Sequence, residues 1–295
     1  MEFGFQIRGC LGSYEVLGRL GKGGFGSVFR ACGPNGVARA VKYLNEDLDQ
    51  DAVVRFEREM KIIAAIDHPN VIDLVDYGID AEGRAWYAMP EMAGGTLADV
   101  IGRDRTWEEL LVLVEGAALG LAELHGRGGI HRDVKPENIL LDALGVPKLA
   151  DFGVARCPEI TGSSMTRGAN GTAYYMAQEV WQGRACKHSD IYALGIVLWE
   201  LVNGQRHTVP AKPPRLLKVG PEFKQMEKLY QAMTHIETRM RPSATEVAKF
   251  CQDFRAQLDR APVPAETTTN WVPWVLGGLG LLAAGGLAVA LLSED

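Results

Sequence analysis

The stretch that decides the fold is His131-Arg132-Asp133-Val134-Lys135-Pro136-Glu137-Asn138. It places five side chains able to ionise or bind metal, and an Asn, between the apolar segments Gly129-Ile130 and Ile139-Leu140-Leu141. So polar a run between two β-prone segments is typical of an exposed loop held by buried strands, and such loops often carry catalytic side chains. Taken alone, the run could equally be an ordinary charged turn.

The composition is that of a globular protein, with 47% hydrophobic and 23% charged residues. A chain of 295 residues could form one large domain or two smaller ones. The net charge is −6 and no long basic run occurs, so we expect no nucleic-acid partner. Five cysteines are scattered without a CxxC pair or a Cys/His cluster, so neither a disulfide framework nor a zinc site is indicated. Reduced thiols in a cytosolic domain are therefore expected.

A glycine-rich turn, Gly21-x-Gly23-x-x-Gly26, precedes the central stretch, and Val28 resumes a strand after it. Glycines let the backbone approach a ligand without an intervening Cβ, and their N–H groups can cover phosphate oxygens. A dinucleotide-binding turn has the same spacing but opens a helix, whereas β-prone residues follow here. We therefore expect a strand–loop–strand hairpin.

The H-R-D-x-K-x-x-N spacing of residues 131–138, followed by Asp151-Phe152-Gly153, resembles the catalytic and metal-binding loops of protein kinases. The glycine hairpin is similar to the loop that covers the nucleotide phosphates in that family. Lys42, which follows Ala40-Val41, resembles the lysine of the kinase V-A-I-K strand. The resemblance extends from about Tyr14 to Phe254 and is to bacterial eukaryotic-like serine/threonine kinases with a C-terminal transmembrane helix.

This resemblance implies an α+β, bilobal fold. The small β-rich N-lobe would cover about residues 14–89 and the larger α-helical C-lobe about residues 94–254. Residues 255–273 would form a linker, and residues 274–292 a membrane helix.

The resemblance also implies an ATP site between the lobes. Met89 would line its back wall, while the Pro90 carbonyl and the Met92 N–H would hydrogen-bond adenine. Lys42 would contact the α and β phosphates, although an isolated strand lysine could also be a solvated edge residue. The cofactor-binding residues implied by the resemblance are Gly21, Gly23, Gly26, Val28, Ala40, Lys42, Met89, Pro90, Met92 and Leu140.

Catalytic roles are implied for Asp133, Lys135, Lys42 and Glu59. Asp133 would accept the proton of a substrate hydroxyl, and Lys135 would contact the transferring phosphate. Glu59 lies on the inner side of a helix expected over residues 51–66, where it would pair with Lys42. A plain surface position for Glu59 is the alternative.

Asn138 and Asp151 would hold the metal, because their hard oxygen atoms suit Mg²⁺, with Mn²⁺ as a second candidate. Lysine two residues after Asp133 indicates Ser/Thr rather than tyrosine in the protein substrates.

Residues 154–171 are polar and rich in turn formers, which predicts a mobile activation loop. Arg132 would capture a phosphate on this loop and order it. The candidate phosphate acceptors are Ser163, Ser164, Thr166 and Thr172, of which Thr166 is favoured as acceptor, while Thr172 would help hold Asp133 and Lys135.

Two further contacts are expected from the resemblance. Ala177-Gln178-Glu179 stands where kinases have Ala-Pro-Glu, and Glu179 would pair with Arg241. Asp190, at the start of a nearly all-apolar helix, would hold the backbone of the central loop.

The stretch 274–292 contains 19 residues without a charge, enough for a helix of roughly 28 Å, about one hydrocarbon core. A buried core helix is the alternative, but it would normally show a polar face. We therefore expect a single-pass anchor in the inner membrane with a cytoplasmic kinase domain. Within this stretch, small residues recur every four positions, at Gly280, Ala284 and Ala288. This spacing lets two helices approach closely, which predicts a homodimer; the alternative is an anchor without a partner.

Three rival functions are considered. A pseudokinase predicts loss of Lys42, Asp133, Asn138 or Asp151, and all four are present. A small-molecule phosphotransferase would generally lack the Gly-Thr…Ala-x-Glu segment that is present here. A receptor that only signals through its tail would need an external domain, and we expect none beyond the span.

Overall fold

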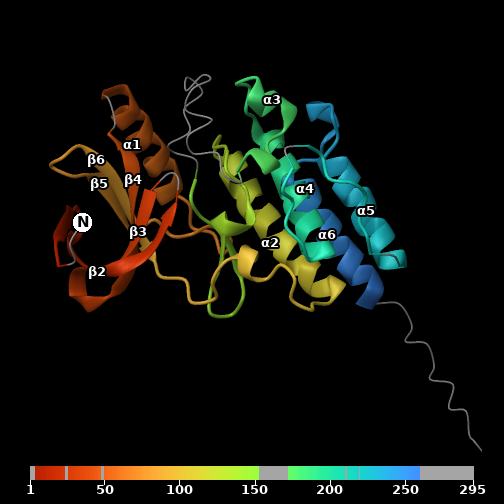
Figure 1. Ribbon diagram of the computed structural model, residues 1–295, viewed down its shortest axis with the longest axis horizontal. Helices are drawn as coiled ribbons and strands as arrows, with labels where there is room; N and C mark the ends of the chain where they lie inside the picture. Colours follow the sequence, from red (N-terminus) through yellow and green to blue (C-terminus); the bar gives the residue numbers. More distant parts are fainter. Residues whose placement is uncertain are drawn as a thin grey trace, which may run out of the picture. The chain divides into compact units, whose positions relative to one another are not determined.

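The computed structural model describes residues 4–23, 26–47, 50–152, 172–209, 211–218 and 220–259. Strands dominate the first part of the chain and helices the second. Figure 1 shows the main strands and α1 grouped on one side, with α2, α4, α5 and α6 grouped on the other. This arrangement agrees with the predicted bilobal fold.

The N-terminal part is a six-stranded antiparallel sheet in the order β1-β2-β3-β4-β6-β5. Its strands are β1 (Gln6–Gly9), β2 (Gly12–Gly23), β3 (Gly26–Cys32), β4 (Ala38–Asp47), β5 (Asp76–Ile79) and β6 (Arg84–Pro90). The glycine-rich stretch lies at the tip of the β2–β3 hairpin, where Gly23 pairs with Gly26. The expected strand–loop–strand arrangement is therefore present.

Helix α1 (Gln50–Ala64) packs an apolar stripe onto this sheet. Phe56, Met60 and Ile63 are each buried, at the three-to-four residue spacing that places side chains on one helix face. They join an apolar group here called the α1 cluster. Its buried members are Ala40, Leu44, Phe56, Met60, Ile63, Ile72, Ala85, Tyr87, Met89 and Ala150.

The first strand was not anticipated from the sequence. β1 pairs with β2, and Ile7 is buried beside Trp86 in the apolar group on the sheet. The buried carboxylate of Asp76 fixes this corner, because it accepts hydrogen bonds from the backbone N–H groups of Cys10 and Leu11. The ordered domain thus begins upstream of the predicted start at residue 14.

The helical part is built around α4 (Lys187–Asn203), which is buried on nearly all sides. A helix that is hydrophobic all round belongs in a core. Helices α2 (Trp107–Gly126) and α5 (Pro221–Met233) pack against α4, and α6 (Ala244–Asp259) packs against α2. The short α3 (Gln178–Trp181) lies near the start of α4. Helix α2 begins at a capping box, in which Thr106 and Glu109 exchange hydrogen bonds, and it ends at Gly126.

The polar stretch 131–138 leads directly into a small two-stranded hairpin. Strand β7 (Ile139–Leu141) pairs with β8 (Pro147–Leu149), and the 3₁₀ turn η3 (Pro136–Asn138) immediately precedes it. The segment that follows β6 is tied to this hairpin, since Gly94 donates to the Leu141 carbonyl and Leu141 donates to the Gly95 carbonyl. Strand β7 follows the polar stretch as expected, but residues 127–130 before it form no strand. Most of its side chains, including His131, Asp133 and Asn138, are buried, whereas the sequence predicted an exposed loop.

Two boundaries differ from expectation. Helix α5 starts at Pro221, in a region that gave no clear prediction, and α6 continues to Asp259, past the predicted domain end at residue 254. The residues described so far form one unit that ends at Asp259. The rest of the predicted linker and the predicted membrane helix 274–292 lie outside the described residues.

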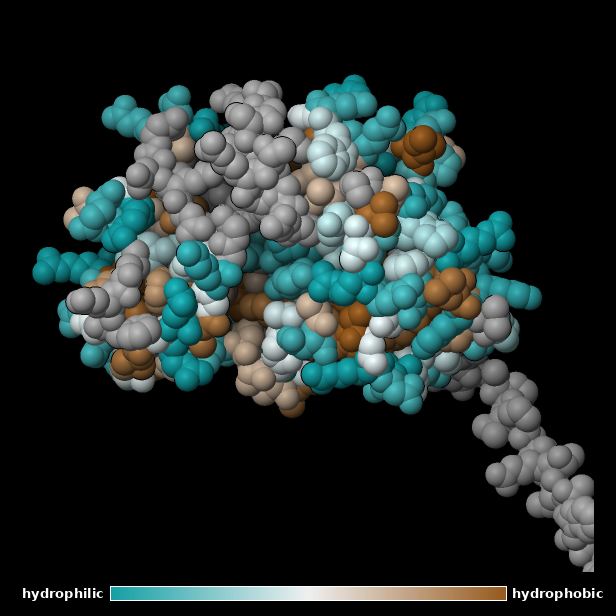
Figure 2. Space-filling view, in the orientation of Figure 1, coloured by the Kyte–Doolittle hydropathy of each residue, from teal (hydrophilic) through white to brown (hydrophobic). Residues whose placement is uncertain are grey.

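Within the described ranges, no helix is both long and apolar enough to cross a bilayer. The face drawn in Figure 2 is mostly hydrophilic, and its hydrophobic residues stand singly or in small groups. Such scattered apolar residues are ordinary for a folded domain.

Candidate active site

Asp190, near the start of α4, holds the backbone of the central loop, residues 131–138. Its carboxylate accepts hydrogen bonds from the N–H groups of His131 and Arg132, both at 2.8 Å, and it contacts Nε2 of His125 at 2.8 Å. Asp190 is 2% exposed, so these contacts are shielded from water. The predicted anchoring role of Asp190 is confirmed.

His131 is fully buried and packs against the ring of Phe152, with the centroids 5.0 Å apart. Its Nε2 lies 3.1 Å from the Ala150 carbonyl. Burial lowers the pKa of His131, which favours the neutral ring. His131 thus joins the central loop to the segment that carries Asp151.

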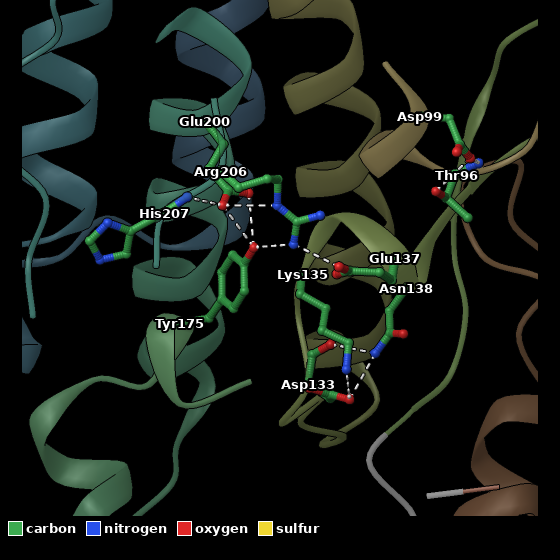
Figure 3. A network of polar contacts seen from close by, with 10 residues as sticks. All are labelled: Thr96, Asp99, Asp133, Lys135, Glu137, Asn138, Tyr175, Glu200, Arg206 and His207. Atoms are coloured by element: carbon green, nitrogen blue, oxygen red, sulfur yellow. Dashed lines mark hydrogen bonds and ion pairs between the residues drawn. The ribbon is translucent and has the colours of Figure 1, made fainter. Parts of the chain in front are cut away.

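Asp133 and Asn138 form the centre of the site. The Asn138 amide nitrogen donates to the main-chain oxygen of Asp133 at 2.8 Å and to its Oδ2 at 2.9 Å. Lys135 Nζ lies 3.1 Å from the same Oδ2 (Figure 3). The turn η3 brings these three side chains together, because it folds the chain back between Lys135 and Asn138. A carboxylate held this way is oriented to accept a proton from a hydroxyl.

Asp151 is joined to this centre through Ala150, whose N–H donates to the Asn138 carbonyl at 2.9 Å. Its carboxylate forms an ion pair with Lys42 of β4 and accepts a hydrogen bond from the Tyr87 hydroxyl of β6. Burial would raise the pKa of Asp151, but the neighbouring Lys42 and the Tyr87 hydroxyl keep it below its usual value. The carboxylate is therefore charged at neutral pH.

Glu59 does not form the ion pair that the sequence predicts. The resemblance predicts an ion pair with Lys42, whereas Glu59 Oε1 lies 2.8 Å from Nη1 of Arg132, and Lys42 contacts Asp151. Burial raises the pKa of Glu59, and Arg132 counteracts that shift.

The apolar residues assigned to the adenine pocket come together. Ala40 and Met89 belong to the α1 cluster, and Val28, Met92 and Leu140 pack against it from three different segments. Pro90 ends β6 and leads into the connection between the two parts.

The glycine hairpin lies next to Lys42 at Gly26. Gly26 has a clear physical reason to be glycine, because a Cβ there would lie 2.1 Å from the Tyr43 carbonyl oxygen and 3.2 Å from Lys42 Cε. Gly21 pairs with Val28 across the hairpin. The structure thus places Gly26 beside Lys42.

The donor set of Asn138 and Asp151 fits a magnesium ion. The Asn138 amide nitrogen is engaged with Asp133, so the amide oxygen is the atom left to bind a cation. Among the residues described, no group of three or more His, Cys, Asp or Glu side chains could hold a metal. One carboxylate and one amide oxygen suit Mg²⁺, which keeps waters and takes its other ligands from phosphates.

A buried polar network beside the site was not anticipated from the sequence (Figure 3). Glu200 of α4 is fully buried, and both its carboxylate oxygens accept from the Tyr175 hydroxyl at 2.9 Å. Arg206 contacts Glu200 at 3.2 Å, the Tyr175 hydroxyl at 2.8 Å and Glu137 of the central loop at 2.6 Å. The signal available in the sequence was a single acid within the apolar stretch of α4.

The predicted pair between Glu179 and Arg241 is confirmed. Two guanidinium nitrogens of Arg241 contact the two carboxylate oxygens of Glu179, at 2.6 and 3.1 Å. Arg241 is 4% exposed, and its side chain also donates to the His188 carbonyl. The Ser hydroxyl of Ser189 donates to Glu179 as well, at 2.7 Å.

Several predicted residues cannot be placed. Gly153, the activation loop 154–171 and its acceptors Ser163, Ser164 and Thr166 lie outside the described residues. Thr172 begins the 3₁₀ turn η4 (Thr172–Tyr175), but its side chain is not described.

The site contains an oriented carboxylate, an amide and an acid suited to a cation, and a lysine next to the glycine hairpin. Together these groups define a phosphotransferase site of the protein kinase type. Comparison with known families agrees, because residues 14–260 match the model of the protein kinase domain. The chain therefore belongs to the protein kinase family.

Curated relatives carry names consistent with that class. Serine/threonine-protein kinase pkn3 of Myxococcus xanthus is 35% identical over 205 residues, which cover 65% of this chain and 38% of the relative. Probable serine/threonine-protein kinase PknB of Lactococcus lactis is 32% identical over 199 residues, or 65% of this chain and 32% of the relative. Serine/threonine-protein kinase PknK of Mycobacterium tuberculosis is 32% identical over 279 residues, which cover 86% of this chain and 25% of the relative. The chain thus matches only between a quarter and two-fifths of the length of these relatives.

Proposed function

We propose that this chain transfers the γ-phosphate of ATP to Ser or Thr hydroxyls of protein substrates. The observation that carries the proposal is the group formed by Asp133, Lys135 and Asn138, which is linked through Ala150 to Asp151 and Lys42. Phosphoryl transfer depends on positioning and on neutralising charge, and these side chains supply both.

Each residue has a role that its contacts support. Asp133 accepts the proton of the attacking hydroxyl, while Asn138 fixes the carboxylate and Lys135 faces the transferring phosphate. Lys42 leaves Asp151 to contact the nucleotide phosphates, and the apolar residues around Met89 hold the adenine. Mg²⁺, when bound by Asp151 and Asn138, neutralises phosphate charge.

Autophosphorylation provides a consistent route to activation. Arg132 holds Glu59 in the observed arrangement, and a phosphate on the loop 154–171 would compete for the Arg132 guanidinium. Release of Glu59 would let it pair with Lys42, the arrangement that active kinases require. We propose Thr166 as the favoured acceptor, with Ser163, Ser164 and Thr172 as the others.

The remaining proposals concern residues outside the described ranges. Residues 274–292 form a membrane anchor in the inner membrane, with the kinase domain on the cytoplasmic side. The preceding segment is a linker, and the Gly280, Ala284 and Ala288 repeat allows the anchor to form a homodimer.

The experiment uses the 295-residue chain with ATP labelled at the γ-phosphate, Mg²⁺, and a protein that exposes Ser, Thr and Tyr side chains. We expect label on Ser and Thr, dependent on the metal ion. A Lys42→Met variant should lose at least about 100-fold in rate, and a Lys61→Met variant, altered at an exposed lysine of α1, should match the parent. Label on tyrosine alone, or equal rates for Lys42→Met and the parent, would refute the proposal.

A further inference from the structure

The carboxylate of Asp151 is held at both oxygen atoms by side chains from neighbouring strands. Lys42 of β4 pairs with Oδ2, and the Tyr87 hydroxyl of β6 donates to Oδ1. Lys42 and Tyr87 are direct partners in the β4–β6 register, so their side chains leave the same face of the sheet. The two strands therefore present one cation and one hydroxyl to a single acid.

The Tyr87 hydroxyl is rigidly placed. Strand β6 is bonded to β4 on one side and to β5 on the other, so its backbone cannot shift as an edge strand can. The Tyr87 ring is 4% exposed and is packed within the α1 cluster. The hydroxyl of this fixed side chain donates to Asp151 Oδ1.

Asp151 needs such support. It adopts a left-handed backbone conformation, with φ of 59°, which a non-glycine residue rarely takes and which persists only where its surroundings impose it. Strand β8, which leads to it, has only three residues. The orientation of this carboxylate therefore depends strongly on contacts made by its own side chain.

These contacts change when a nucleotide binds. Lys42 is the cation that the phosphates attract, so its pair with Asp151 is lost or weakened in the loaded site. Tyr87 carries no charge, and its bond to Oδ1 can remain while the other lone pairs of the carboxylate face a cation. Hydrogen bonds to the atoms of a metal ligand fix its orientation, and their loss typically lowers metal affinity 10- to 100-fold.

We propose that Tyr87 is a positioning residue for the metal–nucleotide site, and that its hydroxyl holds Asp151 in the orientation that binds the cation. The inference rests on the proposed function, because it assumes that Asp151 binds a nucleotide-associated cation. The opposite role is also testable: the Tyr87 hydroxyl would then compete with the cation, and its removal would tighten metal binding.

The test compares Tyr87→Phe with Tyr77→Phe in the full 295-residue chain. Tyr77 is the register partner of Tyr87 on β5, and among the contacts of the described residues its hydroxyl forms no hydrogen bond, so its variant removes an equivalent oxygen elsewhere on the sheet. Binding of a fluorescent ADP analogue is titrated with Mg²⁺, and then measured in EDTA. Thermal unfolding without ligand reports the stability of each variant.

We expect Tyr87→Phe to need about tenfold more Mg²⁺ for half-maximal ADP binding. Its affinity for ADP in EDTA should stay within about twofold of the parent, a split that a merely structural role would not produce. Tyr77→Phe should match the parent in both measurements.

An unchanged or lower Mg²⁺ requirement in Tyr87→Phe would overturn the inference and leave the proposed function standing. An equal loss of ADP binding with and without Mg²⁺ would also overturn it, because the hydroxyl would then support the fold alone. A parent chain that binds no ADP at any Mg²⁺ concentration would overturn the proposed function and this inference together.

Discussion

Replacing Arg206 with Met should destabilise the helical part by leaving Glu200 without its cation. Arg206 contacts Glu200, Tyr175 and Glu137, so one guanidinium neutralises a fully buried acid and also reaches the central loop (Figure 3). After the change, Glu200 would keep its bonds from the Tyr175 hydroxyl and from the backbone N–H of His207, at 2.6 Å. The variant therefore removes charge compensation and leaves most hydrogen bonds in place.

The size of the effect follows from burial. Removing one partner of a fully buried ion pair costs about 3–5 kcal/mol. The Arg206 side chain is 38% exposed, so water screens part of the interaction and we expect a loss of about 1–3 kcal/mol in the free energy of unfolding at pH 7. Met retains much of the apolar stem, which limits the loss of packing.

The pH dependence has a definite sign. Burial raises the pKa of Glu200 above its ordinary 4.5, although the His207 N–H and Arg206 counteract the shift. A carboxyl with a raised folded-state pKa stabilises the fold below its unfolded pKa, and that contribution is lost as pH rises through the folded pKa. Loss of Arg206 raises the folded pKa further, so the deficit of the variant should shrink as pH falls from 7 towards 4.5.

Urea unfolding of parent and variant at pH 7 and pH 5 measures both effects. Arg239→Met is the matched control, because that side chain is 84% exposed, and its loss should stay within about 0.5 kcal/mol. In a Glu200→Gln background, Arg206→Met should cost at least about 1 kcal/mol less than in the parent. Equal losses in both backgrounds, or no loss beyond the Arg239→Met control, would refute this account of the network.

Three other changes have clear expected outcomes. Gln178→Pro should stabilise the protein by about 0.5–1 kcal/mol, because Gln178 is exposed at the first position of α3 and proline suits that position; a loss in the unfolding midpoint would contradict this. Asp190→Asn should cost about 3 kcal/mol in the free energy of unfolding and disable phosphate transfer, because an amide cannot accept all the hydrogen bonds that this carboxylate receives. Chemical unfolding and a transfer assay measure the two effects, and a fully active variant would count against the anchoring role. Burial raises the pKa of Cys251 to about 12, so at pH 8 iodoacetamide should label exposed Cys10 long before Cys251, as read by mass spectrometry; similar labelling rates would contradict the buried placement.

Much of the site could be predicted because its chemistry demands fixed residue types at fixed spacing. Asp133, Lys135 and Asn138 lie within the short segment 133–138, which ends in the turn η3, so their spacing along the chain already brings them together. The pair of Glu179 with Arg241 could be predicted only from the resemblance, because 62 residues separate them. Local rules also suffice for the capping box at Thr106, where the interacting groups are three residues apart.

The features that were missed depend on which distant side chains meet. Glu59 lies near several arginines, and the sequence does not show that it pairs with Arg132, 73 residues away along the chain. Tyr87 and Met89 are two residues apart along β6, so both lie on one face of the sheet, but the sequence does not show that Asp151 lies opposite that face. The start of α5 did have a signal, since Pro221 follows Gly220, a common way to begin a helix.

The most direct test of the central claim compares γ-phosphate transfer by the parent chain and by Asp133→Asn, with ADP binding measured on both. Asn keeps the shape of the side chain but cannot take the proton of the attacking hydroxyl. We predict that the transfer rate falls by about 10²–10⁴-fold while ADP affinity stays within about threefold. Transfer by Asp133→Asn at the parent rate would contradict the account.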